Sequence, residues 1–123
     1  MATFTRLEDI QVWQKARQLT RRIYEATANG KFAQDHGLKN QVQRASVSIM
    51  ANIAEGFGRR SDKEFANFLN MAHGSASEVQ SHLYVALDLN YVTEACFTEL
   101  RDLLDEISRM SLTLAQHLRK SKL

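Results

Sequence analysis

The chain has 123 residues, a formal net charge of +2, one cysteine and no proline. Its length fits one domain over residues 1–123, and its single cysteine excludes an intramolecular disulfide and a multi-cysteine zinc site. No apolar run reaches the roughly 18 residues needed to cross a bilayer, and no signal-peptide pattern opens the chain, so we expect a cytoplasmic protein without membrane contact.

The first predicted helix runs from Leu7 to about Ala28. Its apolar residues recur every three or four positions, which is the spacing of an amphipathic helix. Its remaining faces carry basic side chains with few acids nearby, at Lys15, Arg17, Arg21 and Arg22. Asn29 and Gly30 end this helix, and we expect residues 31–36 to be irregular.

A second helix is predicted from about His36 to Glu55, with Asp35 as its N-cap. Apolar residues lie on two adjacent faces, so we expect this helix to be enclosed in a bundle, while Lys39 and Arg44 point away from its main apolar seam. Glu55 lies in the last turn, where the helix dipole disfavours an anion by a few tenths to about 1 kcal/mol. A cationic partner for Glu55 is therefore expected.

The corner after this helix carries explicit local signals. Gly56 and Gly58 are expected to take a positive φ, as residues at a helix C-terminus often do. Ser61 and Glu64 form a predicted capping box, in which the Ser61 hydroxyl accepts from the Glu64 N–H and Glu64 reaches back to the Ser61 N–H. These signals predict a tight turn between two helices.

The third predicted helix runs from Asp62 to about Leu89 and carries a heptad seam. The seam consists of Phe65, Leu69, Ala72, Ala76, Val79, Leu83 and Ala86. Gly74 lies at its centre, and a glycine inside a helix costs roughly 1 kcal/mol relative to alanine. We therefore expect a neighbouring helix to approach closely at Gly74.

A fourth helix is predicted after Thr93, its candidate N-cap. Its seam consists of Phe97, Leu100, Leu104, Ile107, Ser111, Leu114 and Leu118. A second stripe, formed by Cys96, Leu103 and Met110, gives the helix more apolar surface than one seam uses. We expect part of that surface to face another subunit, and we interpret Cys96 as a packing residue.

Basic and acidic residues are unevenly distributed along the chain. Residues 1–60 contain ten Lys or Arg and five Asp or Glu, a formal charge of +5, and residues 61–123 contain six and nine, a formal charge of −3. This distribution predicts a basic side. A solvated surface without a binding role is the alternative interpretation.

The motifs of catalytic and metal sites are missing. The string from Gly56 to Ser61 resembles part of a dinucleotide-binding loop, but such a loop follows a strand and here a helix precedes it. A di-iron bundle needs Glu-x-x-His pairs, and none of the four histidines has a Glu three residues before it. No metalloprotease, nucleophile-elbow or Walker A string occurs either, so we expect no enzyme, no metal and no cofactor.

Two stretches carry a resemblance to a known family. They are LEDIQVWQKARQLTRRIYEAT (residues 7–27) and GLKNQVQRASVSIMANIAEGFGRRSDKEFANFLNMAHGSASEVQSHL (residues 37–83). The chain resembles the bacterial four-helix bundle proteins encoded in intervening sequences of 23S rRNA genes. The most specific parts are VWQKA, NIAEGFGR and the S-x-K-E-F entry to the third helix.

This resemblance implies an all-α, up-and-down four-helix bundle that assembles into a ring of five subunits. It also implies a relation to the basic, nucleic-acid-binding accessory proteins of diversity-generating retroelements. Most members have no established activity. The family commonly has proline where this chain has Met50, so the resemblance does not imply a kink there.

We therefore expect a non-catalytic module that binds RNA or DNA and forms a homo-oligomer, with a pentamer as first choice. The candidate phosphate contacts are Lys15, Arg17, Arg21, Arg22, Lys39, Arg44, Arg59 and Arg60. Phosphate contacts position a nucleic acid without reading its sequence. The alternative is a scaffold for a protein partner, in which the basic surface serves only solubility.

Overall fold

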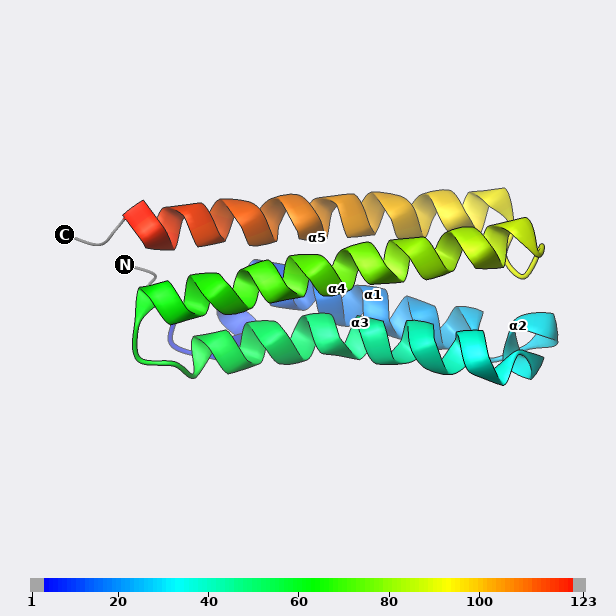
Figure 1. The fold of residues 1–123 in the computed structure, drawn as a ribbon, viewed down its shortest axis with the longest axis horizontal. Coiled ribbons are helices and arrows are strands. Elements are labelled where there is room, and N and C mark those ends of the chain that lie inside the picture. The colour runs from blue at the N-terminus through cyan, green and yellow to red at the C-terminus, as the bar shows by residue number, and fades with distance from the viewer. Residues whose placement is uncertain (1–3, 121–123) are drawn as a thin grey trace.

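The computed structural model describes residues 4–120, which form helices and turns and no strand. Four long helices run alternately up and down one axis (Figure 1): α1 (Gln11–Ala26), α3 (His36–Phe57), α4 (Asp62–Asp88) and α5 (Glu94–Lys120). A short 3-10 helix η1 (Leu7–Asp9) precedes α1, and a short helix α2 (Gly30–Gln34) lies between α1 and α3. The expected all-α, up-and-down four-helix bundle is confirmed. Within residues 4–120, no helix is both long and apolar enough to cross a membrane.

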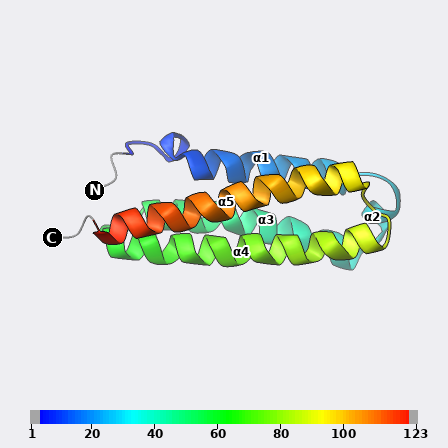
Figure 2. The ribbon, with the colours of Figure 1, turned by 90° about the horizontal axis from the view of Figure 1, so that it is seen from above.

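Contacts between side chains establish the order of the helices around the bundle axis. The Thr20 hydroxyl of α1 donates to the Ser46 carbonyl of α3 at 3.2 Å, and Ser48 of α3 lies 3.0 Å from Ser75 of α4. Arg119 of α5 donates to Asn67 of α4 at 3.1 Å, and α5 also pairs with α1 through ion pairs. The order is therefore α1, α3, α4 and α5, with α1 diagonally opposite α4 (Figure 2).

The core is made by the apolar seams of these helices. All residues of the predicted α4 seam are buried, and so are all residues of the predicted α5 seam except Leu114, which is half-buried. Ser111 is fully buried, and its hydroxyl has no hydrogen-bond partner within the described residues.

The second apolar face of α3 is not enclosed as predicted, because Val47 on that face is 43% exposed. Met50 continues α3 without interruption.

One predicted boundary at the N-terminal end of the bundle is wrong. The first helix does not start at Leu7, because Ile10 is extended (ψ 109°) and separates η1 from α1. The Asp9 carboxylate accepts from the Thr5 hydroxyl at 2.9 Å and the Arg6 N–H at 3.0 Å, which holds the chain in a local turn. Burial of Ile10 at this junction then directs α1 into the bundle.

Residues 31–36 are not irregular, because α2 forms there. Its Phe32 is buried and packs against Tyr91, with ring centres 5.4 Å apart. The Tyr91 hydroxyl donates to Asp35 at 2.9 Å, and Asp35 also accepts from the Leu38 N–H at 3.1 Å, which confirms it as the N-cap of α3. The hydrogen bond from the Leu38 N–H, and to a smaller extent the one from Tyr91, lower the pKa of Asp35, because both stabilise its carboxylate form.

The glycines of the α3–α4 corner have a different role from the predicted one. Gly58 has φ −76°, and among the described glycines only Gly30 has a positive φ. Gly56 is buried, and a Cβ there would lie 2.8 Å from the Phe68 Cβ and 2.9 Å from Phe65 Cδ1. Gly56 is thus required by the close approach of α4 rather than by its own backbone angle.

Gly74 also differs from expectation. Beyond the neighbouring backbone of α4 itself, a Cβ added there would meet no atom of residues 4–120 within 4 Å, so none of the other described helices approaches it. Gly74 is exposed on α4. The cost of a helix-interior glycine at this position therefore has no compensation within one chain.

Candidate functional site

The basic side chains of α1 divide between its outer face and its boundary with α5. Lys15, Arg17 and Arg21 line a shallow surface depression of about 440 Å³. Arg17 lies 5.8 Å from the centre of the Trp13 ring, and Arg21 lies 3.4 Å from Glu25. Since residues four apart lie on the same side of a helix, Arg17 and Arg21 project together from the exposed side of α1.

The boundary between α1 and α5 is closed by ion pairs. Lys15 lies 3.4 Å from Glu106, and Arg22 pairs with Glu99. The hydrogen bond from Arg22 lowers the pKa of Glu99 and raises the pKa of Arg22, because each charge favours the ionised form of the other. Lys15 and Arg22 are thus compensated by acids of the same chain.

Two predicted residues lie on α3. Lys39 is half-buried in the second turn of the helix, and Arg44 is exposed. Arg44 borders two depressions, one of about 330 Å³ that it shares with Tyr24 of α1, and one of about 220 Å³ that it shares with Glu78 and His82 of α4. Within residues 4–120, neither Lys39 nor Arg44 has an ion pair or a hydrogen bond from its side chain.

Tyr24 joins these groups into one surface. It is 45% exposed, follows Arg21 by three residues on α1, and lines the same depression as Arg44. We call the surface formed by Arg17, Arg21, Tyr24 and Arg44 the α1–α3 face. Tyr24 follows the buried Ile23 directly, but its three-residue spacing from Arg21 places it on the exposed side of α1.

Arg59 is exposed, but contacts with its own chain hold its side chain in the corner. Its guanidinium lies 2.9 Å from Glu55 and 3.6 Å from Glu64, and it stacks over the Phe68 ring at 4.9 Å. The predicted cationic partner of Glu55 is thereby confirmed. The Ser61 hydroxyl accepts from the Glu64 N–H at 3.1 Å as predicted, but the Glu64 carboxylate accepts from that hydroxyl at 3.2 Å and does not reach the Ser61 N–H.

Arg60 is exposed and has no ion pair within the described residues. It lies at the opposite end of α3 from Lys39, a separation of roughly 27 Å at 1.5 Å per helical residue. The structure therefore brings Arg17, Arg21 and Arg44 together on one face and leaves Arg60 apart from them in a single chain.

Different effects are expected for the two corner arginines. Arg59→Ala removes two ion pairs and a cation–π contact that connect α3 to α4, so the free energy of unfolding should fall by about 1 kcal/mol. Arg60→Ala removes none of these contacts and should leave stability unchanged. Urea unfolding followed by circular dichroism measures both. Equal stability of the two variants would show that Arg59 does not hold the corner.

The charge distribution of the sequence corresponds to two sides of the bundle. Helices α1 and α3 contain six basic and two acidic residues, a formal charge of +4. Helices α4 and α5 contain five basic and nine acidic residues, a formal charge of −4. Because α1 lies beside α3 and α4 beside α5, the basic residues gather on one side of the molecule.

The described part of the chain was expected to hold no metal site. No group of three or more His, Cys, Asp or Glu residues within residues 4–120 is placed to hold a metal ion. Cys96 is half-buried, and burial raises the pKa of its thiol, which disfavours the reactive thiolate.

Comparison with known proteins gives a family match and a structural match. The family model described as 23S rRNA-intervening sequence protein matches residues 8–113. A crystal structure of a protein with unknown function from the S23 ribosomal protein family of Bacteroides thetaiotaomicron VPI-5482 is similar, with a TM-score of 0.77 and 25% sequence identity over 85% of this chain and 97% of that chain. No functionally curated protein matches the chain.

Proposed function

Because the chain belongs to the 23S rRNA-intervening sequence protein family, we propose that it is a non-catalytic module that binds RNA or DNA through phosphate contacts. The observation that carries this proposal is the α1–α3 face. Its Arg44 has no acid partner among the described residues, its Arg17 contacts only an aromatic ring, and its Arg21 is exposed beside Glu25. Charges of this kind remain available to an external anion.

The chemistry of this face suits a sugar–phosphate backbone. Guanidinium groups offer forked N–H donors that match phosphate oxygens, and such contacts add affinity without sequence preference. Tyr24 lies among them with its side chain 45% exposed, where it can stack on an unpaired base.

Assembly into a ring, with five subunits as first choice, is the second part of the proposal. Met71 and Val85 of α4 are 54% and 44% exposed, and Leu89, the residue that follows the helix, is 48% exposed. Their spacing places them on one side of the helix, together with the open Gly74, and the exposed Glu78 lies between Met71 and Val85 on that side. We call Met71, Gly74, Val85 and Leu89 the α4 stripe. Large apolar side chains exposed on both sides of Glu78 support contact with a second copy of the chain. In a ring, each α1–α3 face would be repeated around the axis.

The assembly has a direct readout. Light scattering coupled to size exclusion should give a mass several times the 14.0 kDa of one chain. Met71→Glu places a charge in the α4 stripe, and it should shift the mass toward that of one chain without unfolding the helix, because Met71 is exposed. A wild-type chain that elutes as a monomer at micromolar concentration would contradict the ring.

The same α4 stripe favours the alternative function, a scaffold for a protein partner. The experiment that separates the two is a fluorescence anisotropy titration of labelled structured RNA, single-stranded RNA and duplex DNA with the wild-type protein at low salt. We expect saturable binding with similar affinity for unrelated sequences of one type. Absence of binding to all of them would leave the scaffold as the better explanation.

A further inference from the structure

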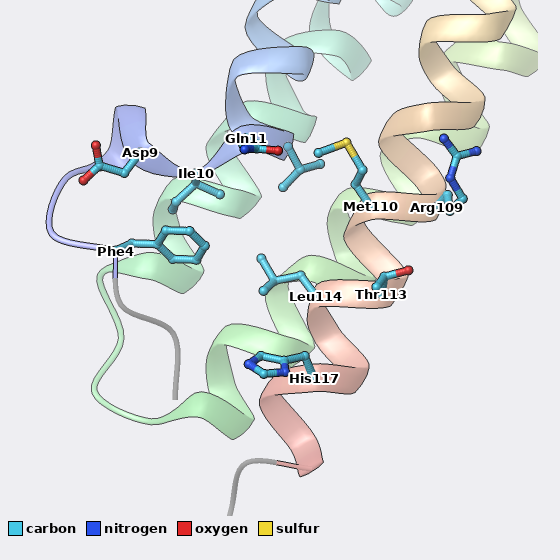
Figure 3. A pocket seen from close by; sticks show the side chains of 10 residues that line it. Phe4, Asp9, Ile10, Gln11, Arg109, Met110, Thr113, Leu114 and His117 are labelled. Carbon is cyan, nitrogen blue, oxygen red and sulfur yellow. The ribbon is translucent and has the colours of Figure 1, made fainter.

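A cavity of about 560 Å³ opens between the start of α1 and the second half of α5. Its walls are mainly apolar: Phe4, Ile10 and Val12 come from the N-terminal segment, and Met110 and Leu114 come from α5. In Figure 3, Phe4, Ile10 and Leu114 face one another across the opening. Its volume lies within the roughly 300–1,000 Å³ that is usual for small-molecule sites.

Polar groups stand at the rim of this cavity. Arg109 and His117 line it from α5, two helical turns apart, and within residues 4–120 neither side chain has a hydrogen bond or an ion pair. Arg109 lies eleven residues before the end of α5. The helix dipole stabilises a cation only in the last turn, so it does not stabilise the charge of Arg109. No Asp or Glu occurs on α5 after Glu106.

The one carboxylate in the wall does not oppose an anion inside the cavity. Asp9 turns away from the opening in Figure 3, and its carboxylate accepts from the Thr5 hydroxyl and the N–H groups of Thr5 and Arg6. The cavity thus combines an apolar interior with a rim that offers one unpaired cation and one unpaired imidazole.

We propose that this cavity binds a medium-chain alkyl carboxylate, with the alkyl chain between Phe4 and Leu114 and the carboxylate at the α5 rim near Arg109. The charge of the rim selects the anion, and the apolar lining selects the chain. This site lies between α1 and α5 and includes no residue of the α1–α3 face, so it does not depend on the proposed nucleic-acid binding.

Isothermal titration calorimetry of the full chain with octanoate, decanoate and dodecanoate, each below its micelle concentration, tests the proposal. We expect one site per chain and an affinity that rises about fourfold for each added methylene, because burial of a methylene contributes about 0.8 kcal/mol. Decyltrimethylammonium has the same alkyl length and the opposite charge, and it should bind at least tenfold more weakly than decanoate. Equal binding of the two amphiphiles, or no saturable binding of decanoate, would overturn the proposal.

Matched variants place the ligand in this cavity. Arg109→Gln should weaken decanoate about tenfold, since a hydrogen bond to a charged group is lost, while Arg101→Gln on the same helix should have no effect. Leu114→Gln should abolish binding, while Leu112→Gln, at an exposed position, should not. If circular dichroism shows that Leu114→Gln does not fold, the Arg109 and Arg101 variants test the location of the site. Both side chains reach solvent, so their replacement should leave the core intact. Unchanged affinity of Arg109→Gln would overturn the assignment.

Discussion

Gly56→Ala is expected to destabilise the bundle by about 1–3 kcal/mol, the usual cost of overpacking a core. The added methyl group would lie 2.8 Å from the Phe68 Cβ and 3.2 Å from the Phe65 carbonyl oxygen. Both neighbours belong to the first turns of α4, so the methyl group can be accommodated only by moving one helix away from the other. A fall of roughly 3 to 12 °C in melting temperature should follow for a domain of this size.

Gly58→Ala is the matched control for this variant. It lies two residues further along the same corner, and a Cβ there would meet its nearest atoms at an ordinary 3.6 Å. Its φ of −76° is also open to any residue. The free energy of unfolding should change by less than about 0.5 kcal/mol. A Gly56→Ala protein as stable as Gly58→Ala would show that α3 and α4 do not approach as closely as described.

Replacing Arg17, Arg21 and Arg44 together by glutamine is expected to cost several hundredfold in affinity for nucleic acid near 0.1 M salt. Each phosphate contact releases about 0.9 of a counterion from duplex DNA, which corresponds to nearly tenfold in affinity per contact at this salt concentration. The three side chains lie on the exposed side of α1 and α3, outside the core. The bundle should therefore fold normally, as circular dichroism can verify.

The control for this triple variant removes the same charge from the opposite side. Arg101, Arg109 and Arg119 all lie on α5, and their replacement by glutamine lowers the net charge by the same amount. If binding requires the α1–α3 face, the α5 variant should keep most of its affinity. Equal losses in the two variants would mean that only net charge matters.

The fold could be predicted from the sequence wherever one helix determines its own structure. The apolar seams of α4 and α5 and the N-caps at Asp35, Ser61 and Thr93 depend on spacing and local hydrogen bonds. They are found as predicted except that Leu114 is half-buried and Glu64 bonds to the Ser61 hydroxyl instead of the Ser61 N–H. Features that depend on two helices were missed. Spacing alone does not reveal that Gly56 meets α4 or that no helix of the chain meets Gly74.

The same distinction explains which contacts of the basic residues could be predicted. Their positions on exposed sides of α1 and α3 follow from helical periodicity, but their ion pairs do not. Glu99 and Glu106 are far from Arg22 and Lys15 in the sequence, and only the packing of α5 on α1 brings them together. A cationic partner for Glu55 could be predicted from its place in the last turn of α3, and Arg59, four residues further on, is that partner. Its contact with Phe68 could not.

The salt dependence of binding tests the central claim most directly. For the wild type and the Arg17/Arg21/Arg44 triple glutamine variant, the association constant for one duplex DNA is measured between 50 and 200 mM salt, and log K is plotted against log salt concentration. If the three arginines contact phosphates, the slope should be steep for the wild type and shallower by about 2.7 for the variant, for each chain in contact. Identical slopes would contradict the assignment of the α1–α3 face as the nucleic-acid interface.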